Sequence, residues 1–258
     1  MGGAERSARK RRQAQSAGAR AVAQARGSSG GNRKTIVAVV AVVVLAALVV
    51  GGVIWTNSSK NQTEGQSIAP VTANAALDTA NERHDATVVS GLDNAPAKID
   101  IYADFLCPYC GQLQKAYGQQ IEQQIEAGKL QVTYHMIPLL NNRSDPPGYS
   151  LASANAALCA ADQGKFTAYH DSLFASQPEE GQRGYDNAQL VKLGQDLGIT
   201  APEFATCVDN GTYNQPLNAA LTKISADPTF QGTPTILHNG TQIDWSKPSW
   251  VTDLVSQS

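Results

Sequence analysis

Two cysteines, Cys107 and Cys110, lie three positions apart in the run Cys107-Pro108-Tyr109-Cys110. Thiols at this spacing can close into a short-range disulfide and open again by exchange with another thiol or disulfide. The thiolate is the reactive form, so the reactivity of the pair depends on how far its surroundings lower the pKa of the attacking sulfur. The pattern predicts thiol–disulfide exchange in which Cys107 is the nucleophile and Cys110 is the resolving thiol.

A strand and a helix are expected to position these cysteines. Residues 98–104 alternate apolar and polar side chains, as a strand does, and residues 107–127 favour a helix that ends at Gly128. Unpaired N–H groups and the helix dipole at the beginning of such a helix favour negative charge and would lower the pKa of Cys107. Pro108 suits the first helical position because its missing N–H costs nothing there.

A structural disulfide and half of a zinc site are the alternative interpretations of this pair. A zinc site needs two further ligands at matching spacing, and the remaining cysteines, Cys159 and Cys207, are distant and do not form a second Cys-x-x-Cys. The four histidines are scattered along the chain, at His84, His135, His170 and His238. The sequence therefore predicts neither a metal site nor a cofactor.

The order of elements predicts one α/β domain over residues 85–258. A strand over 130–137 completes a strand–helix–strand unit with the elements around the cysteines. A helical block over about 145–228 follows, and then a β-hairpin over 234–245 and a last helix over 249–256. This order predicts a thioredoxin-like fold in which helices are inserted between a βαβ half and a ββα half.

The residues before this domain predict a membrane anchor. Residues 1–34 are basic and lack apolar periodicity, which predicts a disordered tail. Residues 36–55 carry no charge, and as a helix they would span about 30 Å, the thickness of the hydrocarbon core. The positive-inside rule puts the tail in the cytoplasm and the residues beyond Trp55 outside. Residues 56–84 are polar and are predicted to be a flexible linker.

A cleaved signal peptide is the alternative to this anchor. Its apolar region would be shorter, and a cleavage site with small residues would follow closely. The nearest Ala-x-Ala, at 73–75, lies too far downstream. The sequence thus favours an uncleaved, single-pass anchor.

The charge of the chain is divided unevenly along its length. Of 20 basic and 22 acidic side chains, 9 and 1 lie in residues 1–34, which leaves the remainder with a net charge of −10. An acidic domain of this kind argues against nucleic acid as a partner.

Three runs, taken together, resemble the DsbA-like thiol–disulfide oxidoreductases of the membrane-anchored actinobacterial type. The first is Tyr-Ala-Asp-Phe-Leu-Cys-Pro-Tyr-Cys at 102–110. The second is Ala-Ala-Leu-Cys-Ala-Ala-Asp-Gln-Gly-Lys-Phe at 156–166, followed by Tyr-His-Asp at 169–171. The third is Gly-Thr-Pro-Thr at 232–235. The resemblance covers about residues 85–256.

The resemblance implies a cis peptide bond between Thr233 and Pro234, in a loop that faces the redox pair. In the family, the backbone of the residue before this proline pairs with the substrate chain, which gives Thr233 that role here. Cis bonds are inexpensive only before proline. An ordinary proline at the beginning of a strand is the alternative from the residues alone.

The sequence departs from the family at two positions. Relatives often bury an acidic residue six positions before the first active cysteine, where this chain has Ile101. Asp100 and Asp104 flank that position, and either could accept a proton from the resolving thiol, although a solvated or capping role is the alternative. Tyr109 replaces the histidine of the most oxidising relatives, so we expect Cys107 to be less acidic than in those proteins.

The two other cysteines are predicted to form a structural disulfide. If Cys107 pairs with Cys110, the partner of Cys159 is Cys207, and both lie in the helical block. A second redox pair or two buried thiols are the alternatives.

The anchor and the resemblance together predict an extracytoplasmic oxidase at the cell membrane, and we expect it to be a monomer. Unfolded exported proteins with free thiols would be its substrates, and a quinone-linked membrane protein of the DsbB or VKOR type would reoxidise it. The first alternative is a disulfide isomerase or reductase kept reduced in the same compartment, because the direction of exchange follows the reduction potential. The second is a metal chaperone or a non-enzymatic adaptor of the same fold. No histidine adjoins Pro234, and the methionines are Met1 and Met136, which speaks against a copper chaperone.

Overall fold

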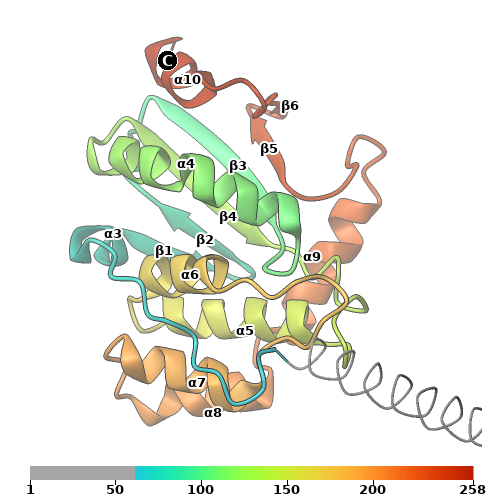
Figure 1. Ribbon diagram of the computed structural model, residues 1–258. Helices are drawn as coiled ribbons and strands as arrows, with labels where there is room; N and C mark the ends of the chain where they lie inside the picture. The colour runs from blue at the N-terminus through green and yellow to red at the C-terminus, as the bar shows by residue number, and fades with distance from the viewer. Residues whose placement is uncertain (1–61, 258) are drawn as a thin grey trace, which may run out of the picture. The chain divides into compact units, whose positions relative to one another are not determined.

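A computed structural model describes residues 62–257 of the chain (Figure 1). The basic tail predicted over 1–34 and the anchor predicted over 36–55 lie outside the described residues. Within residues 62–257, none of the helices has the length and apolar character needed to cross a membrane.

A six-stranded sheet forms the centre of the described part, with the strand order β1-β2-β4-β3-β5-β6. Its strands are β1 (Asn81–His84), β2 (Thr87–Ser90), β3 (Ala97–Ala103), β4 (Leu130–Met136), β5 (Thr235–His238) and β6 (Thr241–Gln242). β3 and β4 are parallel, and every other neighbouring pair is antiparallel. The βαβ unit predicted from the sequence is therefore confirmed.

The alternation of buried and more exposed side chains along β3 explains its place in the middle of the sheet. Ala97, Ile99, Ile101 and Ala103 are all buried, whereas Lys98 on the opposite face is exposed. Strands with one fully apolar face are stable where that face is covered by helices. α4 (Pro108–Glu126) provides this cover: it packs against β4, and α10 (Trp250–Gln257) lies beside it.

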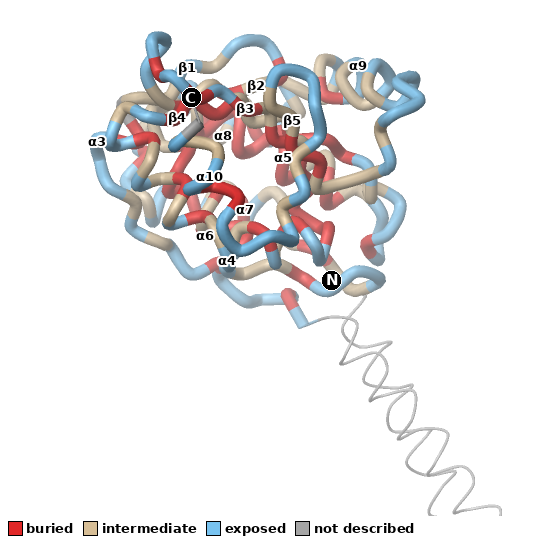
Figure 2. The backbone as a smooth tube through the Cα atoms, turned by 90° about the horizontal axis from the view of Figure 1, so that it is seen from above, coloured by how far each residue is buried: buried red, intermediate tan, exposed pale blue. Residues whose placement is uncertain are grey.

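Helices α5 to α9 form the insertion, which follows β4 in the chain and lies beside and below the sheet in Figure 1. They are α5 (Tyr149–Ala161), α6 (Phe166–Ala175), α7 (Asn187–Asp196), α8 (Pro202–Asn210) and α9 (Asn214–Ser225). α5 is buried along most of its length and contacts each of the other four, so it is the core of the block (Figure 2). The predicted thioredoxin-like order of βαβ, helical insertion, hairpin and final helix is confirmed.

The return strand of the hairpin is shorter than predicted. It ends at Gln242, whereas the sequence pattern extends to residue 245. Oδ1 of Asp244 accepts hydrogen bonds from the backbone N–H and the hydroxyl of Ser246, at 3.1 and 2.6 Å. Such an aspartate-centred turn competes with strand pairing and ends the ladder early.

The flexible linker predicted over 56–84 is wrong for its part from Gln62 onward. That part contains α3 (Ala75–Thr79) and β1, and the side chains of Ile68 and Leu77 are almost fully buried. Its path crosses the helical block before it reaches the sheet (Figure 1).

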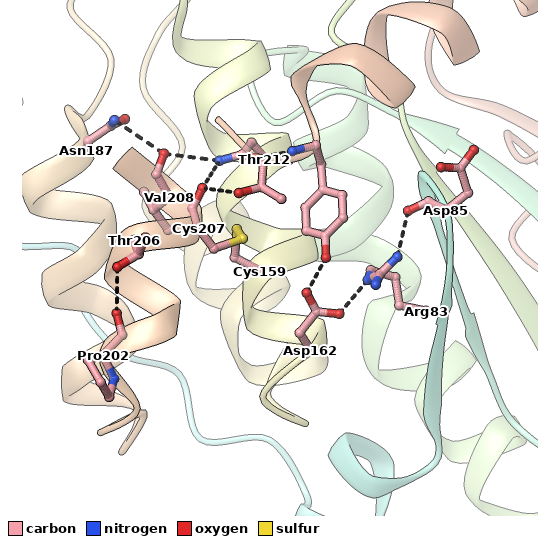
Figure 3. Close-up of a disulfide and its surroundings, with 12 residues drawn as sticks. Arg83, Asp85, Cys159, Asp162, Asn187, Pro202, Thr206, Cys207, Val208 and Thr212 are labelled. Atoms are coloured by element: carbon pink, nitrogen blue, oxygen red, sulfur yellow. Dashed lines mark hydrogen bonds and ion pairs between the residues drawn. A yellow bond between two sulfur atoms is a disulfide. The ribbon is translucent and has the colours of Figure 1, made fainter. Parts of the chain in front are cut away.

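Polar side chains hold residues 62–84 in place. Their contacts explain why the sequence pattern did not predict an ordered segment here. Nε2 of Gln189, in α7, donates to the carbonyl oxygens of Thr63 and Gln66, each at 2.6 Å. Arg83 of β1 donates through Nε to Asp162, which also accepts a hydrogen bond from the Tyr213 hydroxyl (Figure 3). Contacts of this kind leave no hydrophobic periodicity in the sequence, so the segment resembles a linker.

Candidate active site

Cys107 stands at the N-cap of α4, and Pro108 takes the first helical position. The carbonyl oxygen of Cys107 accepts hydrogen bonds from the backbone N–H groups of Cys110 and Gly111, at 3.0 and 3.2 Å, which begin the helix. Both cysteines of the motif are free thiols here, with exposed fractions of 5% for Cys107 and 1% for Cys110. Cys107 is thus the more exposed of the two, which suits it to meet an incoming thiol.

The surroundings separate the acidities of the two thiols. The pKa of Cys107 is lowered to about 6, first by its hydrogen bond with the Cys110 thiol, against the opposing effect of burial. Contact with Thr233 and the N–H groups of Cys110 and Tyr109 lower it further. Burial raises the pKa of Cys110 well above its ordinary value, and the neighbouring Cys107 adds to this effect. At neutral pH this arrangement favours a thiolate on Cys107 and a thiol on Cys110.

The loop before β5 approaches Cys107 from the other side. The peptide bond between Thr233 and Pro234 is cis, and the Cys107 thiol donates to the Thr233 carbonyl oxygen at 3.2 Å. β5 begins at Thr235, which pairs with Tyr102 of β3, so the sheet holds this loop beside the end of the strand that leads to the cysteines. A backbone carbonyl at this place can pair with an extended chain whose cysteine reaches Cys107.

Asp104 lies in the turn between β3 and the cysteines and is 2% exposed. Its carboxylate accepts hydrogen bonds from the backbone N–H groups of Leu106 and Leu140, each at 2.8 Å. Burial raises the pKa of Asp104, and these two N–H groups oppose the increase. The carboxylate therefore joins the turn over residues 105–107, called the catalytic turn below, to the loop at Leu140. Its use as a proton acceptor for Cys110 stays a prediction.

Asp100 is not at the thiols. Its Oδ1 lies 2.8 Å from Nε2 of His135 on β4, and the ring of that histidine stacks on Tyr102 with a centroid distance of 4.2 Å. Asp100 and Tyr102 are two positions apart on β3 and so lie on the same face of the sheet. The opposite face contains the buried Ile101, six positions before Cys107.

A disulfide joins Cys159 of α5 to Cys207 of α8, with a Cα–Cα distance of 5.9 Å (Figure 3). This is the pairing expected from the sequence, and it lies within the helical block, where α5 and α8 pack together. Among the described residues, no group of three or more His, Cys, Asp or Glu side chains is placed to hold a metal ion.

Two features of the site have no clear signal in the sequence. Tyr109 is 61% exposed and forms an apolar surface next to Cys107. A groove of about 530 Å³ runs between α4 and α6, and Pro108, Gly111, Phe174 and Gln177 are among its lining residues. Gln177 also donates hydrogen bonds to the catalytic turn. A single glutamine after a helix does not predict such a contact from the sequence.

Comparison with known proteins identifies the family. A family model described as thioredoxin matches residues 83–252. The serine/threonine-protein kinase PknE of Mycobacterium tuberculosis is 29% identical over 180 residues, which cover 65% of this chain and 31% of that protein. The chain therefore spans under a third of that relative's length.

Two solved structures from Mycobacterium tuberculosis share the fold. The reduced disulfide bond oxidoreductase DsbG is 28% identical with a TM-score of 0.57, over 65% of this chain and 80% of that one. Reduced DsbA is 28% identical with a TM-score of 0.56, over 65% of this chain and 84% of that one. Because the family model covers more than half of the chain, this protein belongs to the thioredoxin family, within its DsbA-like group.

Proposed function

We propose that the protein is a thiol–disulfide oxidoreductase of the DsbA type that introduces disulfides into exported proteins. The observation that carries this proposal is the unequal acidity of the two thiols, with the pKa of Cys107 lowered to about 6 and that of Cys110 raised. Surroundings that stabilise the thiolate of the reduced form make the corresponding disulfide more oxidising. The names of the solved relatives, DsbG and DsbA, support the same chemistry.

The reaction proceeds by two exchange steps. In the oxidised enzyme, a client thiolate attacks Sγ of Cys107, the Cys107–Cys110 bond breaks, and Cys110 leaves with the electron pair and takes up a proton. A second client thiolate then attacks the client sulfur of the mixed disulfide, and Cys107 leaves as a thiolate. The client gains a disulfide, and the enzyme gains the two electrons.

The loop at Thr233 and Pro234 is the proposed client-binding element. The Thr233 carbonyl oxygen lies 3.2 Å from Sγ of Cys107, within reach of a backbone N–H next to a client cysteine. The exposed side chain of Tyr109, two positions after Cys107 in the sequence motif, offers apolar contact to a client without selecting particular client side chains. Backbone pairing of this kind tolerates many sequences, which suits a protein that acts on unfolded chains.

Several features support a location outside the membrane. Residues 36–55 have the length and apolar character expected of a spanning helix, and the basic side chains before them favour a domain outside the membrane. The disulfide between Cys159 and Cys207 supports the same location, because such bonds persist mainly in oxidising compartments. In that location, a quinone-linked membrane protein of the DsbB or VKOR type would reoxidise the Cys107–Cys110 pair, and the enzyme would act as a monomer.

The reduction potential of the Cys107–Cys110 pair tests the direction of this activity. We expect the full chain in detergent, equilibrated with glutathione buffers, to have a potential between the roughly −120 mV of the strongest oxidants and the about −180 mV of disulfide isomerase. It should also restore disulfides to a reduced, unfolded client protein. A potential near the roughly −270 mV of thioredoxin, without client oxidation, would instead identify a reductase.

Alkylation of Cys107 as a function of pH tests the proposed nucleophile. Iodoacetamide reacts with thiolates, so the rate for the reduced protein should rise with a midpoint near pH 6, because the pKa of Cys107 is lowered to about 6. The Cys107→Ser variant is the control and should lose this phase. A midpoint near 4 would show that Tyr109 leaves the thiolate as stable as in the most acidic relatives, and a midpoint near 8.5 would show no stabilisation.

A further inference from the structure

We infer that Gln177 is a positioning residue that fastens the catalytic turn to the helical insertion and thereby sets how readily Cys107 exchanges. The inference rests on the proposed function, since it concerns the same cysteine. It assigns a role to a side chain that belongs neither to the Cys-x-x-Cys motif nor to the loop at Pro234.

The amide of Gln177 connects the insertion to the backbone of the turn. The residue lies two positions beyond the end of α6. Its Nε2 is 2.9 Å from the carbonyl oxygen of Phe105 and 2.9 Å from that of Cys107. A side-chain amide nitrogen carries two hydrogens, so one goes to each carbonyl and both donors are used.

The two carbonyl groups flank the residue before the nucleophile. The carbonyl oxygen of Cys107 is also the acceptor for the first N–H groups of α4. On the other side, the N–H of Leu106 donates to the Asp104 carboxylate at 2.8 Å. The turn between Phe105 and Cys107 is thus held from both sides, and its orientation decides where the N–H groups at the beginning of α4 point.

Aromatic packing adds a second attachment between the same segments. The ring of Phe105, which is almost fully buried, lies 4.8 Å from the ring of Phe174 in the last turn of α6. The backbone N–H of Gln177 donates to the carbonyl oxygen of Phe174 at 3.3 Å. A side chain and a backbone carbonyl of the turn are therefore both anchored in one short stretch of the insertion.

Gly111 makes room for the Gln177 amide. A Cβ atom built on Gly111 would lie 2.2 Å from Oε1 of Gln177, far inside contact distance. Glycine is less favourable than alanine within a helix, and Gly111 lies in the first turn of α4. The close approach of the amide gives a physical reason for glycine at this position.

Loss of the amide should loosen the orientation of the turn. The N–H groups of Tyr109 and Cys110 that stabilise the Cys107 thiolate would then be less well aligned with the sulfur. Stabilisation of a charge at a helix N-terminus is worth about 0.3–1 kcal/mol, and one pH unit corresponds to about 1.4 kcal/mol. The alkylation midpoint should therefore rise by several tenths of a pH unit.

The test compares Gln177→Ala and Gln177→Glu with Gln112→Ala in the reduced full chain in detergent. Gln112 is exposed on the same groove, and among the described residues no hydrogen bond joins it to the catalytic turn. We expect both Gln177 variants to raise the alkylation midpoint and to make the Cys107–Cys110 disulfide less oxidising, which shifts its equilibrium with glutathione about 2- to 5-fold, the range that follows from the same free energy. Gln177→Glu should have the larger effect, because an ionised carboxylate cannot donate to the carbonyls. Gln112→Ala should leave both readouts unchanged.

A double-mutant cycle tests the match between Gly111 and Gln177. In the wild-type background, Gly111→Ala should displace the amide, reproduce the raised midpoint and lower the melting temperature. In the Gln177→Ala background, the same change should leave the midpoint unaltered and raise the melting temperature, because alanine favours the helix once the clash is gone.

Two results would overturn the inference. One is a Gln177→Ala protein that melts at a lower temperature but keeps the wild-type alkylation midpoint and the wild-type equilibrium with glutathione, since Gln177 would then be structural only. The other is a double-mutant cycle in which the effects of Gly111→Ala and Gln177→Ala on the alkylation midpoint simply add, because the two residues would then act independently. Neither readout uses a client protein, so failure of the wild-type protein to oxidise clients would count against the proposed function and not against the role of Gln177.

Discussion

Replacing Cys107 with serine is expected to reduce disulfide formation in a reduced client protein to the uncatalysed rate. Cys110 cannot take over, because it is 1% exposed and burial raises its pKa well above the ordinary value. The measurement is the loss of client thiols with time, with the full chain in detergent and glutathione disulfide as the oxidant. The melting temperature of the variant should stay close to that of the wild-type protein.

Cys110→Ser is the matched control for this experiment. It keeps the reactive sulfur but removes the resolving thiol, so it should accumulate a mixed disulfide through Cys107 that is visible by mass spectrometry. If Cys107→Ser still oxidised the client at the wild-type rate, the chemistry would have to lie at Cys159 and Cys207, and the assignment of the active site would fail.

Removing the second disulfide should affect stability and leave the chemistry intact. Its cysteines are 48 positions apart, and a bond that closes a loop of this length typically contributes about 2–4 kcal/mol to the free energy of unfolding. We therefore expect Cys159→Ala with Cys207→Ala to lower that free energy by a similar amount in urea unfolding, with an unchanged alkylation midpoint for Cys107. Wild-type protein unfolded with a strong reductant should match the variant.

Thiol counting provides an independent check on this bond. Mild reduction of the oxidised protein should release the thiols of Cys107 and Cys110 first, because Cys159 is buried and its bond to Cys207 joins two packed helices. If both bonds were reduced equally easily, the bond between Cys159 and Cys207 would be a second redox pair, and a structural role could not be maintained.

The sequence predicts the parts of the fold that are built on apolar periodicity and on backbone rules. The alternation on β3, the proline and glycine that bound α4, and the order of elements are all local signals. The cysteine motif is local as well, since the beginning of a helix brings Cys107 and Cys110 together. The family resemblance adds the position of Pro234, which lies more than 120 residues away in the chain.

Contacts that depend on polar side chains from distant segments could not be predicted. Gln189 holds Thr63 and Gln66, and Gln177 holds the catalytic turn, but a glutamine can serve as donor or acceptor almost anywhere. Which of the two candidate proton acceptors, Asp100 or Asp104, lies near the thiols also depends on long-range geometry. β3 ends at Ala103, so Asp104 lies in the turn that follows, where alternation no longer predicts its side-chain direction.

Both edges of the sheet discourage the attachment of a foreign strand. β1 consists of Asn81, Glu82, Arg83 and His84, and its charges make an extended apolar chain a poor neighbour. At the opposite edge, β6 has only two residues, too few to template a ladder. A protein that handles unfolded polypeptides meets aggregation-prone segments continually. Edges of this kind would let such chains engage the redox centre and leave again without nucleating aggregates on the enzyme.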